Sequence, residues 1–175
     1  FYGDGEYEII IYSTSQRQIY CIDRYGNSEA NWPIDLPDSV YGCEGAGGSV
    51  GDIDLDGLPD YVLKATSKIY AYNYNGALLE GFPIQVINSE YYFNLWWGVT
   101  LADIDSDSYL ELLVSGNRWE SGIYDSYVAV YEHNGQLKDG WPLYFSGCLD
   151  WQMPIAADIN NDDILEIGFS CLLYT

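Results

Sequence analysis

Basic residues are scarce in this sequence of 175 residues: 6 Lys and Arg stand against 27 Asp and Glu, so the formal net charge is -21. A surface this negative repels phosphate backbones and anionic membrane faces, so nucleic acid is excluded as an expected partner. No apolar run approaches the roughly 20 residues of a membrane helix, so we expect no membrane insertion. The single histidine, His133, and the single Met leave little for histidine-based catalysis or soft-metal binding.

The cysteines have no CxxC spacing, which argues against a zinc or thioredoxin-type motif. They are Cys21, Cys43, Cys148 and Cys171. An even number suits disulfides in an oxidising compartment, with three possible pairings, and it equally suits a set of buried free thiols. Both alternatives stay open. The sequence starts without Met and shows no signal peptide, so we expect a processed chain or a fragment.

Hydrophobic residues make up 48% of the chain and aromatic residues 17%, which excludes a disordered chain. The chain also contains an internal repeat. Three acidic segments align, starting at Gly51, Ala102 and Ala157, and a partial fourth starts at Gly3. The third acidic positions, Asp4, Asp56, Asp107 and Asp162, are separated by 52, 51 and 55 residues.

A second motif repeats in the same phase. A turn glycine precedes an aromatic-Pro pair by six residues in three places: Gly26 before Trp32-Pro33, Gly76 before Phe82-Pro83, and Gly135 before Trp141-Pro142. We expect the three aromatic residues to pack in the core. Two motifs in register indicate repeats at approximately 1-45 (partial), 46-95, 96-148 and 149-175 (partial), all within one β-propeller region.

Each repeat shows the pattern of short antiparallel strands: Tyr, Val and Ile alternate at period two between Gly, Asn and Asp. Four strands in about 52 residues predict a β-propeller blade, so the fold is expected to be all-β. WD40 repeats are shorter, and kelch repeats lack the acidic turn. About 13 strands, or 3.25 blades, fall short of the four to eight that usually close a ring. We therefore expect part of a larger propeller, completed by the same chain or another.

The acidic turns predict metal sites. The first, DIDLDGLPD, carries carboxylates at Asp52, Asp54, Asp56 and Asp60, and alternate positions of a tight turn lie on one side. Without a cation these groups would repel one another strongly. That many oxygen ligands, with the Leu58 carbonyl, suit Ca²⁺, while Mg²⁺ is the second choice. A solvated acidic turn that binds nothing is the other alternative.

An EF-hand or dockerin-like loop opens with a similar motif but needs a Glu at position twelve. Position twelve is Leu63, Val114 or Phe169 in the three loops. The last acidic ligand is therefore expected at position nine, which is Asp60, Glu111 or Glu166.

The acidic loop, the following apolar strand, the IYAYNYNG turn and the GFP or GWP ending together resemble the FG-GAP/VCBS repeats of integrin-α-like β-propellers. The resemblance implies Ca²⁺ in the loop between the first two strands of a blade, usually in secreted or cell-surface proteins. Carried over by position, it implies these ligands: Asp52, Asp54, Asp56, the Leu58 carbonyl and Asp60; Asp103, Asp105, Asp107, the Tyr109 carbonyl and Glu111; Asp158, Asn160, Asp162, the Ile164 carbonyl and Glu166.

The loops depart from this pattern in ways that predict an affinity order. Ser108 and Asp163 stand where the first loop has Gly57, and Asn160 replaces a carboxylate. The expected order is the Asp52 loop, then the Asp103 loop, then the Asp158 loop. The partial N-terminal copy keeps only Asp4 and Glu8, so we expect no site there.

One segment breaks the repeat. GNRWESGIYDS, from Gly116 to Ser126, is an insertion, which we expect to be a loop. Trp119, with Arg118 and Glu120, could stack on a sugar or a partner side chain, and plain loop padding is the alternative. Trp96 and Trp151 are expected to begin strands near the propeller axis, where they either line a ligand face or pack centrally.

The leading hypothesis is a non-catalytic, Ca²⁺-stabilised extracellular propeller module that recognises a protein or a carbohydrate ligand. One alternative is a glycan-binding lectin, which the many Tyr and Trp residues permit. Another is the propeller of a secreted polysaccharide lyase or hydrolase. Such an enzyme would need a basic, His-containing cleft for an acidic sugar, which six basic residues and one His disfavour.

Overall fold

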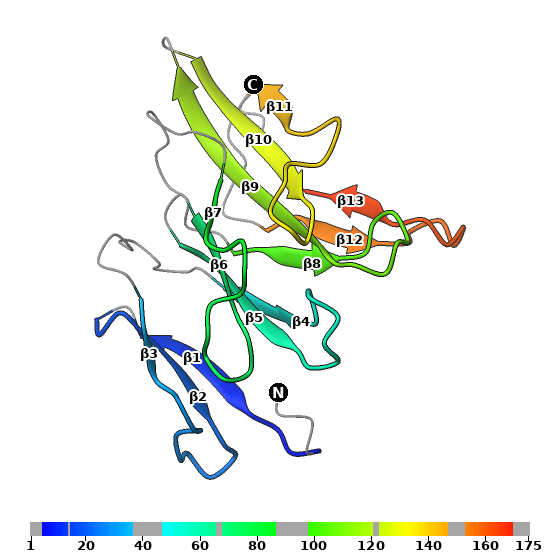
Figure 1. The fold of residues 1–175 in the computed structure, drawn as a ribbon. Helices are drawn as coiled ribbons and strands as arrows, with labels where there is room; N and C mark the ends of the chain where they lie inside the picture. Colours follow the sequence, from blue (N-terminus) through cyan, green and yellow to red (C-terminus); the bar gives the residue numbers. More distant parts are fainter. Residues whose placement is uncertain are drawn as a thin grey trace.

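The computed structural model describes residues 5–13, 15–36, 47–65, 68–86, 98–120, 123–146 and 153–169. Its regular structure consists of strands in four antiparallel sheets of three, four, four and two strands (Figure 1). Within these residues, no helix is long and apolar enough to cross a membrane. The all-β prediction is confirmed.

Each sheet is a meander, in which strands adjacent in sequence are hydrogen-bonded neighbours. The first sheet contains β1 (Ile9–Ser13), β2 (Gln18–Ile22) and β3 (Ile34–Asp35). The second contains β4 (Gly48–Gly51), β5 (Asp60–Ala65), β6 (Lys68–Tyr72) and β7 (Ile84–Gln85). The third contains β8 (Thr100–Ala102), β9 (Glu111–Glu120), β10 (Ile123–Tyr131) and β11 (Leu143–Ser146), and the fourth β12 (Ile155–Ala157) and β13 (Glu166–Gly168).

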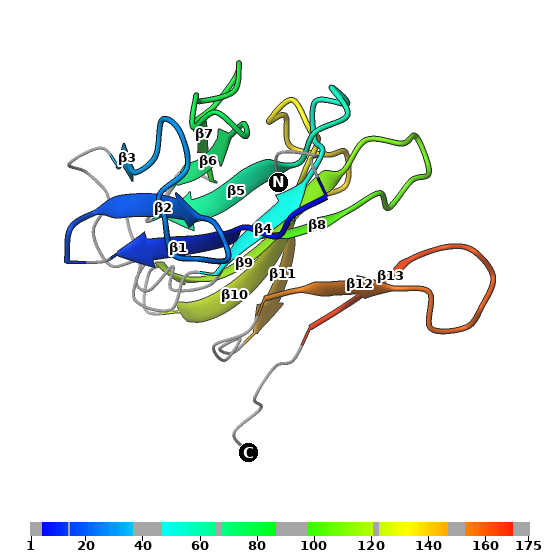
Figure 2. The same cartoon turned by 90° about the horizontal axis from the view of Figure 1, so that it is seen from below.

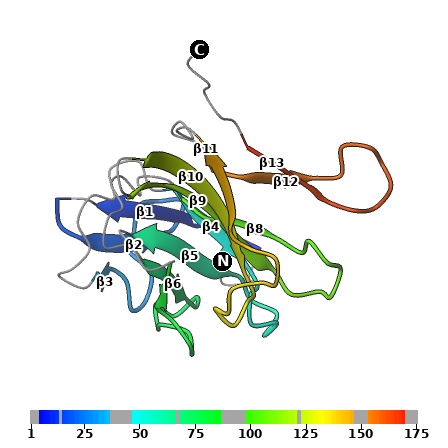
Figure 3. The ribbon, with the colours of Figure 1, turned by 90° about the horizontal axis from the view of Figure 1, so that it is seen from above.

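The first three sheets lie next to one another in chain order (Figures 2 and 3). Buried side chains pack between neighbouring sheets. Strand β5 shows how the period-two alternation builds two cores at once. Tyr61 and Leu63 join a cluster with Ile19 of the first sheet, whereas Val62 joins a second cluster with Leu112 of the third. The second sheet is therefore covered by a neighbouring sheet on both faces.

Two of the three turn glycines, Gly76 and Gly135, lie against the preceding sheet. A Cβ added at Gly76 would lie 2.7 Å from Cγ2 of Ile34 in β3, and one at Gly135 would overlap Cγ2 of Ile84 in β7. Trp32 strengthens the first of these junctions, because its Nε1 donates a hydrogen bond to the carbonyl oxygen of Tyr74 over 3.1 Å. The repeated turn therefore also fixes the spacing between neighbouring sheets.

The aromatic-Pro pairs share one conformation, since all three have a cis peptide bond. Trp32 and Phe82 are buried in the clusters between sheets, as expected for core residues. Trp141 is only partly buried and packs with Phe145 and Phe169 beside the two-stranded sheet.

The insertion after Gly116 is not a loop, contrary to expectation. Residues 116–120 continue β9 and residues 123–126 belong to β10, so the insertion lengthens one hairpin. Within the lengthened part, Ser126 Oγ donates a buried 2.7 Å hydrogen bond to Oδ1 of its cross-strand neighbour Asn117. The side chains of Arg118, Trp119 and Glu120 lie outside the described part, as do Trp96 and Trp151 in full.

Cys21 is a buried free thiol in the cluster between the first two sheets. Burial, followed by the charges of Glu29 and Glu8, raises the pKa of Cys21 to about 11. The other cysteines, Cys43, Cys148 and Cys171, lie outside the described residues. For Cys21, the free-thiol alternative therefore holds.

Candidate metal centres

Three acidic loops connect β4 to β5, β8 to β9 and β12 to β13, and all three lie at the same end of their sheets (Figures 1 and 2). They share one backbone course. The fourth and sixth positions of each have a positive φ: 60° at Leu55 and 89° at Gly57, 64° at Ser106 and 79° at Ser108, 63° at Asn161 and 66° at Asp163. The sixth position therefore keeps the left-handed conformation in the second and third loops, although Ser108 and Asp163 stand there in place of a glycine.

In the first loop, backbone N–H groups hold the carboxylates in position. Asp52 accepts hydrogen bonds through Oδ1 from the N–H of Asp56 (3.1 Å) and through Oδ2 from that of Gly57 (3.0 Å). Asp60, at the start of β5, accepts one through Oδ2 from the N–H of Ile53 (2.9 Å). The loop is thus tied at both ends to its own acidic side chains.

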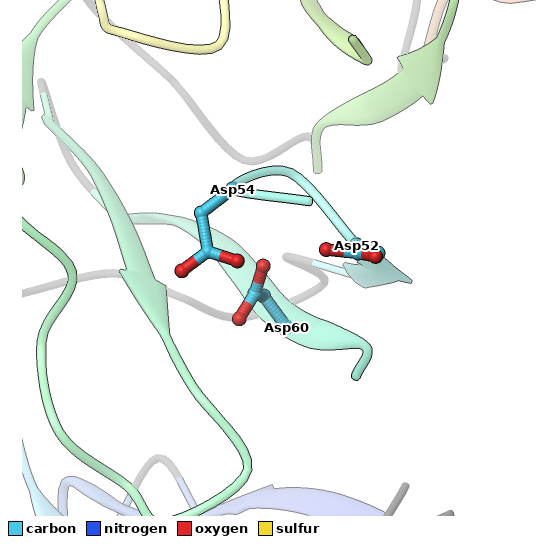
Figure 4. Close-up of side chains that lie close together, drawn as sticks. All are labelled: Asp52, Asp54 and Asp60. Atoms are coloured by element: carbon cyan, nitrogen blue, oxygen red, sulfur yellow. The ribbon is translucent and has the colours of Figure 1, made fainter. Parts of the chain in front are cut away.

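Asp52, Asp54 and Asp60 converge, as Figure 4 shows. Each offers a carboxylate oxygen, and the three oxygens all lie within 4.8 Å of one another. Asp60 is only 1% exposed. Burial first, and then the nearby carboxylates, raise the pKa of Asp60 to about 6, against the opposing hydrogen bond from Ile53. The arrangement favours a hard cation, which would offset this mutual repulsion.

The fifth-position carboxylates each accept a hydrogen bond within the turn. Asp56 Oδ1 accepts a 2.8 Å hydrogen bond from the N–H of Leu58, and Asp56 is not in the group of three acids whose oxygens converge. Asp107 does the same with Tyr109 (2.9 Å), and Asp162 with Ile164 (3.0 Å). The structure therefore brings together positions one, three and nine. The ligand roles of position five and of the three position-seven carbonyls stay predictions.

The second loop repeats the cluster with Asp103, Asp105 and Glu111, whose oxygens again lie within 4.8 Å of one another. Glu111 is fully buried, and its Oε2 accepts a 2.8 Å hydrogen bond from the N–H of Ile104. Its Oε1 is buried without a hydrogen-bond partner. Burial raises the pKa of Glu111, although the Ile104 hydrogen bond and the Lys138 charge act against it.

Sequence reasoning missed Lys138. Its Nζ lies 2.7 Å from Asp105 Oδ2, 2.9 Å from Glu132 Oε1 and 3.7 Å from Glu111 Oε1. The repeat held a signal for it, because Lys138 and Leu79 both stand three residues after the turn glycine. A charge at a position that is apolar in the preceding repeat marks a residue with a local partner.

The third loop has the same backbone conformation as the other two, but its side chains make different contacts. Asp158 accepts hydrogen bonds from the N–H groups of Asn161, Asp162 and Asp163. Desolvation acts to raise the pKa of Asp158, but these hydrogen bonds hold it below its ordinary value. Asn160 Nδ2 donates a 2.8 Å hydrogen bond to Glu166 Oε1. The third and ninth positions therefore satisfy each other here. Asp4, of the partial N-terminal copy, lies outside the described residues.

The family model of the FG-GAP-like repeat matches residues 52–114, from the first acidic loop into β9. No match was found among curated proteins. Among solved structures, the chain is similar to the V. cholerae biofilm matrix protein Bap1, with 17% sequence identity and a TM-score of 0.48. The similarity covers 94% of this chain and 32% of that one, so this chain spans about a third of that protein's length. The chain therefore contains an FG-GAP-like repeat over residues 52–114, which confirms the resemblance inferred from the sequence.

Proposed function

We propose that this chain is a Ca²⁺-binding, non-catalytic β-propeller module for extracellular recognition. The observation that carries the proposal is the convergence of Asp52, Asp54 and Asp60, which the next repeat reproduces with Asp103, Asp105 and Glu111. In both clusters the ninth-position acid is almost fully buried. Burying like charges this close together is costly unless a cation lies between them.

Ca²⁺ fits these residues better than other common metals. The converging groups are all carboxylates, and neither cluster contains a His or Cys ligand, which zinc would favour. Ca²⁺ accepts six to eight oxygens in flexible geometry, whereas Mg²⁺ requires a stricter octahedron. In the first loop the ion would join the residue after β4, the loop and the start of β5. Its contribution is to fix the conformation of a loop that has two residues with positive φ.

The proposal of a propeller is supported by the topology of the sheets. Four-stranded antiparallel meanders that pack side by side are the units of propeller blades. Two such meanders lie in the middle of the described chain, with three strands before them and two after them. We propose that further strands, from the same or another chain, complete a ring. Light scattering tests this: a closed, monodisperse monomer of 19.8 kDa would contradict it.

Recognition of a protein or carbohydrate ligand is the role that suits a propeller with rigid loops. The extracellular location follows from the FG-GAP resemblance. A net charge of -21 disfavours an acidic polysaccharide as substrate. A glycan-array screen with and without EGTA separates the ligand classes: Ca²⁺-dependent glycan binding would identify a lectin, and its absence would favour a protein ligand.

The Ca²⁺ proposal is tested by calorimetry and thermal unfolding of the wild type, Asp54→Asn and Asp139→Asn. Asp139 is an exposed acid outside the clusters, so its variant controls for the loss of one charge. Ca²⁺ at a hundredfold excess over Kd should stabilise each independent site by about 2.7 kcal/mol. Asp54→Asn should lose most of the gain from the first site, and Asp139→Asn should keep it. No Ca²⁺ uptake by the wild type, with a melting temperature unchanged by EGTA, would overturn the proposal.

A further inference from the structure

Lys138 places a side-chain ammonium at the second acidic loop, and this feature separates that loop from the first. We propose that Lys138 is a built-in cation, which holds the second loop's carboxylates together in the absence of metal and makes this loop bind Ca²⁺ more weakly than the first. The affinity part of this inference rests on the proposed function. The counter-ion part does not.

The ammonium joins acids from both sides of the site. Asp105 and Glu111 belong to the loop and to β9, whereas Glu132 follows β10, as does Lys138. The distances from Nζ to Asp105 and Glu132, 2.7 and 2.9 Å, are those of charge-assisted hydrogen bonds. Glu111 lies further away, at 3.7 Å, but its facing Oε1 has no hydrogen-bond partner. The ammonium is therefore the cation that faces this buried oxygen.

A second contact keeps the Lys138 turn against the loop. Tyr109, at position seven of the loop, stacks on His133 with ring centroids 3.9 Å apart and an interplanar angle of 16°. His133 lies between Glu132 and Lys138 in the same turn. Lys138 is itself only 17% exposed, so solvent and salt screen its charge less than at an open surface.

Competition with a metal follows from the identity of the acids. Asp105 occupies the third position, which the first loop fills with Asp54, and its Oδ2 is the atom nearest to the ammonium. An entering Ca²⁺ must displace the ammonium from Asp105 or sit beside a positive charge. Both raise the free energy of the bound state. In the first loop the corresponding residue is Leu79, which packs on the hydrophobic cluster between the sheets.

Calorimetric Ca²⁺ titration of single-loop proteins tests the affinity part. An Asp54→Asn background removes the third-position carboxylate of the first loop, which the third loop lacks already, so that the second loop gives the tightest transition. There Lys138→Met should tighten Ca²⁺ binding by about tenfold or more, because one positive charge leaves the neighbourhood of the ion. Lys138→Arg should bind as the parent does. In an Asp105→Asn background, Leu79→Lys should weaken the first loop by a similar factor.

Thermal unfolding in EGTA tests the counter-ion part without metal. Lys138→Met should melt below both the wild type and Lys138→Arg, and saturating Ca²⁺ should close or reverse that gap. A merely structural lysine would leave the same gap with and without Ca²⁺. Equal melting of Lys138→Met and wild type in EGTA would overturn the counter-ion part.

The two proposals fail differently. Ca²⁺ uptake by the first loop, with an affinity of the second loop that Lys138→Met leaves unchanged or weakens, would overturn the affinity part alone. No Ca²⁺ uptake by any of these proteins would overturn the proposed function and the affinity part together, and the EGTA unfolding would still decide the counter-ion part.

Discussion

Asn160 donates a hydrogen bond from Nδ2 to Oε1 of Glu166 over 2.8 Å, across the third acidic loop. The same two positions in the first loop are Asp54 and Asp60, whose carboxylates converge without such a bond between them. One amide in place of one carboxylate thus turns a mutually repelling pair into a self-satisfied pair. The third loop therefore has less need of a cation than the first.

Asn160→Asp should therefore strengthen Ca²⁺ binding by the third loop. The variant restores the third carboxylate, so we expect calorimetry to show additional Ca²⁺ uptake and EGTA to lower its melting temperature more than that of the wild type. Asn161→Asp is the matched control, because it adds the same charge at the neighbouring exposed residue. Equal Ca²⁺ uptake by the two variants would mean that the added charge alone, rather than the third position, determines binding.

Ser108→Gly should stabilise the protein. Ser108 has a φ of 79°, a conformation that costs a residue with a Cβ about 1 kcal/mol and costs glycine little. Gly57→Ser is the reciprocal change. A Cβ there meets nothing within 4 Å, so only the conformational cost applies, and the variant should be destabilised by a similar amount. Urea unfolding in EGTA measures both. Opposite signs are expected, and a destabilising Ser108→Gly would contradict the strain argument.

Gly135→Ala should destabilise the protein more than Gly26→Ala. The two glycines hold the same place in their repeats and have a similar φ, 83° and 86°, so the conformational cost of alanine is shared. They differ in surroundings: a Cβ at Gly135 would overlap Ile84, whereas one at Gly26 meets nothing within 4 Å. The overlap should add about 1–3 kcal/mol in urea unfolding. Equal losses would show that the turn does not fix the spacing of the sheets.

Cys21 should resist alkylation in the folded protein. Its pKa, raised to about 11 chiefly by burial, leaves on the order of 0.1% thiolate at pH 8, and the thiolate is the reactive form. Iodoacetamide treatment followed by peptide mapping should show little label on Cys21 in the native protein and full label in urea. Because the pKa is raised, reactivity should increase as the pH approaches 11. Rapid native labelling at pH 8 would contradict the buried position.

Repetition made much of the fold predictable. Two motifs in one phase set four groups of strands. The expectation of half-buried strands was wrong for β5, because Tyr61, Val62 and Leu63 are all buried between the neighbouring sheets. The nine-residue spacing of the acidic loops predicted that positions one and nine meet, and Asp52 and Asp60 do so. Local pattern was sufficient because each loop closes on itself.

The features that the sequence did not reveal depend on contacts across the chain or on hydrogen bonding within the turn. Lys138 reaches Asp105, 33 residues earlier, and no spacing rule within a loop contains that pair. The alternation predicts Asp56 as a ligand, which stays a prediction, but it does not reveal the hydrogen bond that Asp56 Oδ1 accepts from the N–H of Leu58. The segment from Gly116 to Ser126 breaks the repeat, which predicts a loop, but Asn117 and Ser126 hydrogen-bond to each other inside a lengthened hairpin.

The most direct test of the account is an anomalous difference map from crystals of the wild-type protein grown with limiting Ca²⁺. We predict the strongest peak among Asp52, Asp54 and Asp60, at about 2.3–2.6 Å from their oxygens, a weaker one at Asp103, Asp105 and Glu111, and the weakest at the third loop. A map without a peak at the first loop, in crystals that diffract well enough to show calcium, would contradict the claim that these carboxylates form a metal centre.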